Sequence, residues 1–407
     1  MKSKLQWLDS GGVASPAGFR ASGIHSGIKK KAGAMDLAML VSDKPAAAAG
    51  VFTLNLVKAA PVLFCKRRLA GKKKIRAVVI NSGCANACTG ARGLSDAGRT
   101  AALAARALDL DPNSVLVCST GTIGKKLPMA AIEQGLPKAA SALSERGGHD
   151  AARAIMTTDT RPKEVAARIV VNGRTVTIGG MAKGAGMIHP NMATLLAFVT
   201  TDAAVAPSAL GRCLKAAADR SFNCISVDGD QSTNDTLLLL ANGAAGNRPL
   251  GPGHPAWNAF CRAVGEVCRK LALMIVRDGE GATKAVTIRI KGAPDERQAR
   301  AAAFAVANSL LVKTSWFGAD PNWGRVLAAL GRSGCKFRPD RVDILYEDLL
   351  AVSRGQPAAY RESALHALIS RPEFTITANL RAGAAEFTAY TCDCSEEYVR
   401  INASYMT

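Results

Sequence analysis

Thr194 is the residue of this chain best placed to act as a nucleophile, because of what lies on either side of it. Gly180, Gly184 and Gly186 precede it and allow backbone angles that other residues avoid. Residues 195–200 follow as an apolar run that predicts a buried strand. A flexible approach that delivers a hydroxyl to the mouth of a strand suits a reactive side chain. A turn whose Thr only caps the strand has the same pattern, so the chemical interpretation needs support from elsewhere.

A Thr hydroxyl is a weak nucleophile until a base lies beside it. If the Ala193–Thr194 bond were cut, the new α-amine of Thr194, with an ordinary pKa of roughly 7.7–8.0, could take the proton. The amide nitrogen of an intact peptide bond cannot. The small residues upstream are compatible with such a cut, and the residues alone leave it open.

Two other predicted strands end in turns rich in hydroxyl groups and glycine. Residues 76–83 lead into a polar turn at 81–90, and the strand that begins near residue 114 ends in Ser119-Thr120-Gly121. Such turns place N–H and O–H donors at the edge of a sheet, where active sites tend to be assembled. We therefore expect part of an active site at this edge.

The rest of the pattern mixes helices with strands and hairpins, which favours an α+β or layered α/β sandwich over a doubly wound sheet. With 407 residues the chain should form two domains or one large sandwich. Asn172-Gly173 predicts a hairpin turn. Helices are expected at 99–110, 129–143, 148–156, 207–220, 257–276 and 296–312, and short buried segments at 46–53 and 60–64. Strands are expected at 236–241, 285–290 and 342–346, and residues 223–235 as a strand that ends in a polar turn. Residues 374–380 and 386–391 are expected to pair as antiparallel strands, and 316–325 to form a polar loop.

Composition indicates where the protein is located and which kinds of site it contains. Apolar residues make up 48% of the chain, but no run approaches the roughly 18 residues of a membrane span. The first ten residues lack the apolar segment of a signal peptide, so we expect a cytoplasmic protein without a membrane partner. The eleven cysteines are scattered, with no paired C-x-x-C motifs, which favours reduced thiols and no metal site.

The net charge of +20, from 52 basic and 32 acidic residues, raises nucleic acid as a partner. The densest basic run, residues 66–76, is expected in a loop before a strand and contains no aromatic residue for base stacking. A solvated basic surface is the preferred interpretation, and no nucleic-acid partner is expected.

Other motifs are weaker. Gly184 and Gly186 lack the third glycine of a dinucleotide-binding loop. Residues 228–235 resemble a calcium loop, but Leu239 occupies the position of its bidentate Glu, so a turn whose side chains cap the backbone is expected. His189 lies five residues before Thr194, and we do not assign it a direct role.

The stretch Lys183–Thr194 resembles the cleavage and nucleophile motif of the ornithine acetyltransferases, also called arginine-biosynthesis bifunctional enzymes. One departure is Cys84, where the family pattern has Asn. Eight further stretches match in order, at residues 59–62, 81–90, 119–124, 157–160, 228–235, 277–284, 320–325 and 398–407.

The resemblance implies a layered α/β sandwich akin to the N-terminal-nucleophile hydrolases, with its own topology. It also implies self-cleavage between Ala193 and Thr194. The products would be an α chain, 1–193, carrying the oxyanion hole, and a β chain, 194–407, beginning with the nucleophile. These chains would stay associated, as an α2β2 heterotetramer.

The activity implied by the resemblance is ping-pong acetyl transfer from N2-acetylornithine to glutamate through an acetyl-Thr194 intermediate. Thr120 and Gly121 would form the oxyanion hole. The implied substrate-binding residues are Thr157, Lys183, Thr194, Glu280, Asn402 and Thr407. No cofactor is implied, and acetyl-CoA is a possible co-substrate that no residue decides. The alternative is an N-terminal-nucleophile aminopeptidase of related fold.

Overall fold

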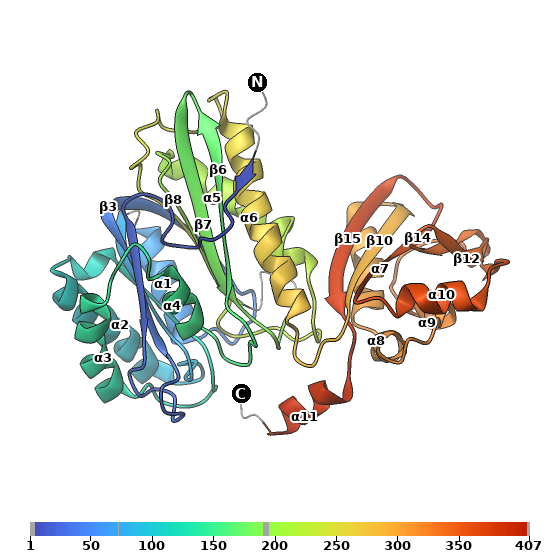
Figure 1. Ribbon diagram of the computed structural model, residues 1–407, viewed down its shortest axis with the longest axis horizontal. Helices are drawn as coiled ribbons and strands as arrows, with labels where there is room; N and C mark the ends of the chain where they lie inside the picture. Colours follow the sequence, from blue (N-terminus) through green and yellow to red (C-terminus); the bar gives the residue numbers. More distant parts are fainter. Residues whose placement is uncertain (1–4, 72, 190–194, 405–407) are drawn as a thin grey trace.

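A computed structural model describes residues 5–71, 73–189 and 195–404, and it contains two sheets that lie side by side (Figure 1). The larger sheet has nine strands, with β2 paired to β3 off the main path. The order along that path is β1 (Gln6–Trp7), β6 (Lys163–Val171), β7 (Arg174–Lys183), β8 (Leu196–Thr201), β9 (Thr236–Ala241), β3 (Leu37–Phe52), β4 (Ile75–Asn81) and β5 (Val115–Ser119), and β2 is Phe19–Ile24.

Strand β3 joins two halves of this sheet. One half contains β1, β6, β7, β8 and β9, and the other contains β2, β4 and β5. Its residues 37–41 pair with β4, the register breaks between Val41 and Ala46, and residues 47–52 pair with β9. Phe198 of β8 and Leu238 of β9 share a core with Leu40 of β3 and Ile80 of β4. The two halves therefore pack face to face, since alternate side chains of a strand point to opposite faces.

Helices cover the two outer faces of this pair of layers. Val199 and Leu239 point away from the inner core and pack against α5 (Pro207–Asp219) and α6 (Trp257–Arg277). Met39 and Val79 pack against α2 (Gly90–Leu108) and α3 (Met129–Ser141). The order of layers is thus α/β/β/α, which confirms the predicted layered sandwich. The short helix α4 (Gly148–Ala154) lies against β2 and β3.

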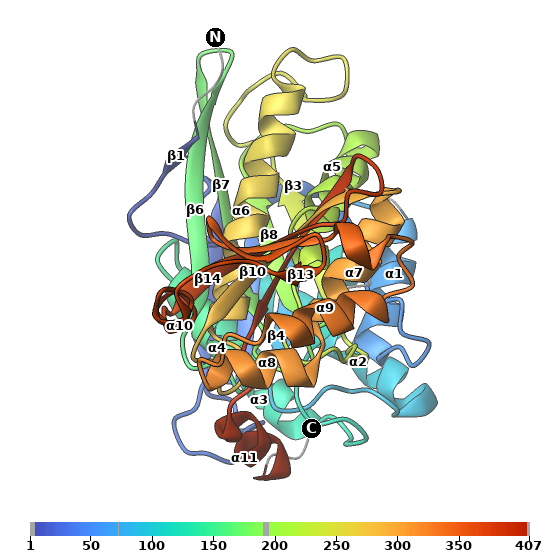
Figure 2. The same cartoon turned by 90° about the vertical axis from the view of Figure 1, so that its right-hand side faces the viewer.

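The second sheet forms a smaller unit with its own core, which faces the viewer in Figure 2. Its strand order is β13 (Gln356–Pro357), β12 (Leu349–Ser353), β11 (Asp343–Tyr346), β14 (Glu373–Asn379), β10 (Ala285–Ala293) and β15 (Ala385–Cys392). Its helices are α7 (Glu296–Ala307), α8 (Leu310–Phe317), α9 (Trp323–Gly331) and α10 (Glu362–Ile369). After β15 the chain leaves this unit, and α11 (Glu396–Ser404) lies below the gap between the two units in Figure 1.

The predicted hairpin is confirmed, because Val171 pairs with Arg174 and both turn residues, Asn172 and Gly173, have positive φ. The antiparallel pairing of 374–380 with 386–391 is wrong. Strand β10 lies between β14 and β15, parallel to the first and antiparallel to the second. The strand that separates them comes from more than 80 residues earlier in the chain, so a local turn signal could not reveal it.

Three further segments differ from expectation. Residues 60–64 belong to helix α1 (Ala60–Ala70), where Pro61 suits the first turn, and the basic run therefore begins on a helix rather than in a loop. Residues 223–227 form a 3₁₀ turn and an isolated bridge, not a strand. The expected helix 296–312 ends at Ala307, and α8 then extends into the predicted polar loop with Trp316 buried.

Within the described parts of the chain, no helix is both long enough and apolar enough to cross a membrane.

Candidate active site

A cavity of about 230 Å³ lies where ends of β5, β7 and β8 meet the segments after α6 and on α11. Its lining includes every described residue that the sequence nominated for the site, namely Thr120, Gly121, Thr157, Lys183, Glu280 and Asn402. Ala193, Thr194 and Thr407 lie outside the described residues. Leu195, the neighbour of Thr194, does line the cavity.

Thr120 and Gly121 follow β5, which runs parallel to β4 with Ser119 beside Asn81. The two donor-rich turns therefore meet at one edge, as predicted. The Thr120 backbone N–H donates to the Asn81 carbonyl at 3.0 Å. Gly121 has φ +123°, and a Cβ there would lie 2.4 Å from the Gly83 carbonyl carbon, so only glycine fits this position. The turn is thus held close against its neighbouring strand end.

Cys84, which departs from the family pattern, lies behind this turn. Its carbonyl accepts a hydrogen bond from the Asn81 side chain at 2.9 Å. The thiol is buried, and burial raises its pKa above the ordinary value. Cys84 therefore contributes a neutral packing group to the back of the turn.

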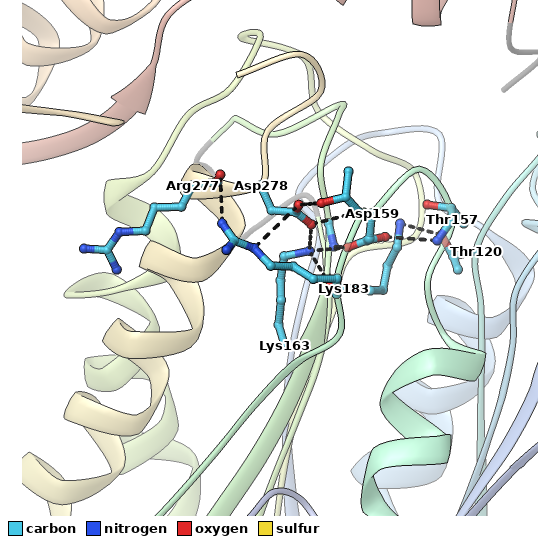
Figure 3. Close-up of polar contacts among 10 residues, drawn as sticks. Thr120, Thr157, Asp159, Lys163, Lys183, Arg277 and Asp278 are labelled. Atoms are coloured by element: carbon cyan, nitrogen blue, oxygen red, sulfur yellow. Dashed lines mark hydrogen bonds and ion pairs between the residues drawn. The ribbon is translucent and has the colours of Figure 1, made fainter. Parts of the chain in front are cut away.

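Lys183 is the last residue of β7 and points into the cavity (Figure 3). Its Nζ donates to the Thr120 Oγ1 at 3.3 Å. Burial lowers the pKa of Lys183, while the negative charge of Asp159 acts in the opposite direction. Because the Thr120 oxygen accepts this bond, the cation polarises the hydroxyl and makes its hydrogen a stronger donor.

Asp159 holds the backbone at two points next to the cavity lining. One carboxylate oxygen accepts the Gly184 N–H at 2.7 Å, and the other accepts the Thr157 N–H at 3.0 Å. Burial alone would raise the pKa of Asp159, but Lys163 and Lys183 lower it to about 2. Asp159 is therefore a fixed anion that positions the Thr157 backbone and the residue after Lys183.

Lys163 forms an ion pair with the Asp159 carboxylate, as Figure 3 shows. Its fully buried Nζ lies 2.6 Å from an Asp159 oxygen and 2.5 Å from an Asp278 oxygen. Asp159, Lys163 and Asp278 were assigned no role from the sequence. A signal was present for Lys163, because it begins the alternating buried face that continues through Val165 and Ala167. A lysine in such a position requires an acidic partner.

Glu280 supplies a negative charge on the other side of the cavity. Its carboxylate accepts a hydrogen bond at 2.8 Å from the Asn402 side chain on α11. A Cβ at Gly186 would lie 2.4 Å from this carboxylate, so Gly186 provides room for it. Lys183 and Glu280 together suit a ligand that carries both a carboxylate and an ammonium group.

The loop 228–235 forms another wall, and it is the backbone-capping turn that the sequence predicted. Asp228 accepts the Met187 and Ile188 N–H groups at 2.5 and 2.8 Å. Asn234 donates to the Ala85 and Ser119 carbonyls at 2.6 and 2.8 Å, which ties the loop to the end of β5.

His189 is not among the described lining residues, and its Nδ1 lies 3.1 Å from the Asn308 amide nitrogen.

Asp228 should make stability depend on pH. Burial raises its pKa to about 6, although backbone N–H groups oppose the shift. A raised carboxyl pKa gives stability that is complete below the unfolded value of about 3.9 and is lost as pH rises through 6. In Asp228→Asn this contribution disappears. Urea unfolding at pH 4 and pH 7 should show the advantage of wild type over the variant shrinking by about 2–3 kcal/mol at the higher pH. A constant difference would contradict the assignment.

Comparison with known proteins identifies the family of this chain. The ArgJ family model matches residues 20–407. The arginine biosynthesis bifunctional protein ArgJ of Symbiobacterium thermophilum is 54% identical over 404 residues, 99% of this chain and 100% of that protein.

Two solved structures also match. The crystal structure of arginine biosynthesis bifunctional protein argJ from Bacillus halodurans is 40% identical, covers 51% of this chain and 98% of its own, and has a TM-score of 0.50. A chain of the ornithine acetyltransferase from Mycobacterium tuberculosis, solved with ornithine, is 46% identical over 47% of this chain and 100% of its own, with a TM-score of 0.44. Because the family match extends over nearly the whole sequence, this chain belongs to the ArgJ family.

Proposed function

We propose that the chain transfers an acetyl group from N2-acetylornithine to glutamate through an acetyl-Thr194 intermediate. Membership of the ArgJ family makes it an acetyltransferase of arginine biosynthesis. The observation that carries the finer proposal is the single cavity lined by all six described residues that the sequence nominated. Its cation, its anion and its donor-rich turn are the groups that an acylated amino acid requires.

The nucleophile becomes active after cleavage between Ala193 and Thr194, which gives an α chain, 1–193, and a β chain, 194–407. The solved relative from Bacillus halodurans supports this division, because a chain matched over 98% of its length covers only 51% of this one. The free α-amine of Thr194 then accepts the proton from the hydroxyl of the same residue. The two chains remain together, in an α2β2 assembly in the cytoplasm.

The roles of the other residues follow from their positions. The Thr120 hydroxyl and the Gly121 N–H stabilise the oxyanion that forms when Thr194 attacks the acetyl carbonyl. Lys183 binds the substrate carboxylate and Glu280 the substrate ammonium, while Thr157, Asn402 and Thr407 complete the binding site. Ornithine leaves, the amine of glutamate attacks the acetyl ester, and the Thr194 hydroxyl is regenerated.

The direct test is to incubate the purified protein with N2-acetylornithine labelled in its acetyl group and with glutamate. Labelled N-acetylglutamate should form, and double-reciprocal plots at several glutamate concentrations should be parallel, as a covalent intermediate requires. Release of N-terminal residues from peptides without acetyl transfer would instead support the aminopeptidase alternative, which the comparisons do not favour.

Thr120→Val removes one oxyanion donor while keeping the side-chain shape. We expect kcat to fall by about 10²–10³, with little change in KM, because the bond is made mainly in the transition state. Thr120→Ser, which keeps the hydroxyl, is the matched control and should stay within about tenfold of wild type. Steady-state kinetics with acetylornithine measure both, and an unchanged kcat in Thr120→Val would remove this residue from the oxyanion hole.

A further inference from the structure

A buried carboxyl group, that of Asp235, lies beside the strand that follows the proposed nucleophile. Strands β7, β8 and β9 are neighbours with their ends in register, so that Leu196 pairs with Lys183 on one side and with Thr236 on the other. Lys183 is the last residue of β7, Asp235 immediately precedes β9, and both line the cavity. The chain therefore enters β8 between a basic side chain from β7 and an acidic one from the residue before β9.

Two hydrogen bonds hold Leu195, which follows Thr194 directly in the chain. The Leu195 N–H donates to the Asp235 carboxyl group. The Leu195 carbonyl accepts the Thr236 N–H at 3.0 Å. Leu195 is buried, so its N–H needs an acceptor within the protein. Because peptide groups are planar, fixing both polar groups of Leu195 fixes the direction in which the chain enters β8.

Asp235 is itself held by its own loop and by the end of β3. The Ser232 hydroxyl donates to its carboxyl group, and its backbone carbonyl accepts the Thr53 N–H at 3.0 Å. Burial raises the pKa of Asp235, while the Ser232 hydroxyl and the charge of Lys183 oppose the shift. A carboxyl group in either protonation state keeps an oxygen that can accept the Leu195 N–H.

The residue before Asp235 connects this arrangement to the proposed oxyanion hole. Asn234 donates to the Ser119 carbonyl at 2.8 Å, and Ser119 immediately precedes the turn that carries Thr120. Two consecutive residues thus bind the turn after β5 and the entry to β8. Their spacing sets where the strand entry lies relative to the oxyanion donors.

We propose that Asp235 is a positioning residue for both reactions of Thr194, self-cleavage and acetyl transfer, and that it acts through the Leu195 N–H. This inference rests on the proposed function. Attack on a carbonyl requires the nucleophile and the oxyanion donors to keep a fixed separation, and a misplacement of about 1 Å can lower the rate by about 10²-fold.

The far end of the same strand provides a matched control. Asp202 follows β8 directly, is also buried, and accepts the Thr177 and Ala17 N–H groups at 2.8 and 3.2 Å. Burial raises the pKa of Asp202 as well. Asp202 is not among the described residues that line the cavity. Removing either carboxyl group leaves buried N–H groups without an acceptor, so both changes should destabilise the fold, but only the first should affect chemistry.

The test compares Asp235→Ala with Asp202→Ala. Urea unfolding should show a lower midpoint for both variants than for wild type. In Asp235→Ala, kcat for acetyl transfer per cleaved chain should fall about 10²-fold with little change in KM. In Asp202→Ala, kcat should stay at the wild-type value. Denaturing electrophoresis of freshly synthesised protein should show slower self-cleavage in Asp235→Ala alone.

Two further variants separate the position of the acceptor from its charge. Asp235→Asn keeps an oxygen at the same distance from the backbone, and kcat should stay within about tenfold of wild type. Asp235→Glu keeps the carboxyl group but moves it by one methylene, so kcat should fall further than in Asp235→Asn. These two variants also decide the matter if Asp235→Ala does not fold.

The outcomes that overturn the proposal are distinct. Equal losses of kcat in the two Ala variants would make Asp235 a structural residue only. A higher KM with unchanged kcat would assign Asp235 to substrate binding, and a higher kcat in Asp235→Glu than in Asp235→Asn would assign its effect to charge. Wild-type protein that is cut but transfers no acetyl group would count against the proposed function alone, because the comparison of self-cleavage rates still tests Asp235.

Discussion

Thr194→Ala is expected to remain a single polypeptide of 42.3 kDa on denaturing electrophoresis, whereas the wild type should give two bands of about half that mass. The variant lacks the hydroxyl that, in the proposed self-cleavage, attacks the preceding peptide bond, so its chain should not be cut. It also lacks the nucleophile that would carry the acetyl group. We expect kcat for acetyl transfer to fall by about 10⁴-fold or more, the scale on which loss of a nucleophile acts in other covalent enzymes.

Thr194→Ser separates the two requirements. It keeps a hydroxyl at the same position, so it should still be cut and should still transfer acetyl groups, at a reduced rate. Mass spectrometry of the wild type after brief incubation with acetylornithine should find the extra acetyl group on the chain that starts at residue 194. Substantial transfer by Thr194→Ala would show that the ester is formed elsewhere.

Lys163→Met should produce the largest loss of stability among the variants considered. It leaves the buried carboxylates of Asp159 and Asp278 without the cation that lies 2.6 and 2.5 Å from them. Removing one partner of a buried ion pair typically costs about 3–5 kcal/mol. Urea unfolding at pH 7 measures this loss. Lys215→Met, which breaks an exposed pair with Asp219, is the control and should change stability by less than about 1 kcal/mol.

The pH dependence of the Lys163→Met defect gives a sharper check. In wild type the pKa of Asp159 is lowered to about 2, so its stabilising contribution is complete above the unfolded value of about 3.9 and is lost as pH falls toward 2. In the variant, burial without Lys163 favours the protonated acid. The difference in unfolding free energy between the two proteins should therefore shrink as pH falls below about 4. A difference that grows on acidification would contradict this role for Lys163.

Local patterns were sufficient to predict the layered sandwich and the donor-rich edge of the site. The turns after β4 and β5 could be located because an apolar strand ending in hydroxyl and glycine residues is a local signal. The continuous apolar runs of β8 and β9 likewise predict strands buried on both faces. Lys183, Glu280 and Asn402 were nominated from the family resemblance, and no spacing in the sequence brings them together.

The features that were missed depend on contacts between distant parts of the chain. Lys163 meets Asp278 across 115 residues, so nothing near either one reveals the pair. The insertion of β10 between β14 and β15 is a choice of partner strand, which hydrophobic pattern does not specify. Helix α1 was not predicted, although the start of it is buried as expected, because four apolar residues fit either a strand or one turn of a helix.

The strand order of the large sheet has a consequence for the proposed two-chain form. Strands β8 and β9 would belong to the β chain, yet β7 flanks β8 on one side and β3 flanks β9 on the other, and both of these would belong to the α chain. The α chain alone would thus lack the two central strands of this sheet, and the β chain alone would lack the strands on either side of them. The cut chains could not part as intact bodies, and separating them should require unfolding both. Cleavage would then make unfolding of the enzyme irreversible. The rate of unfolding would set the lifetime of the enzyme.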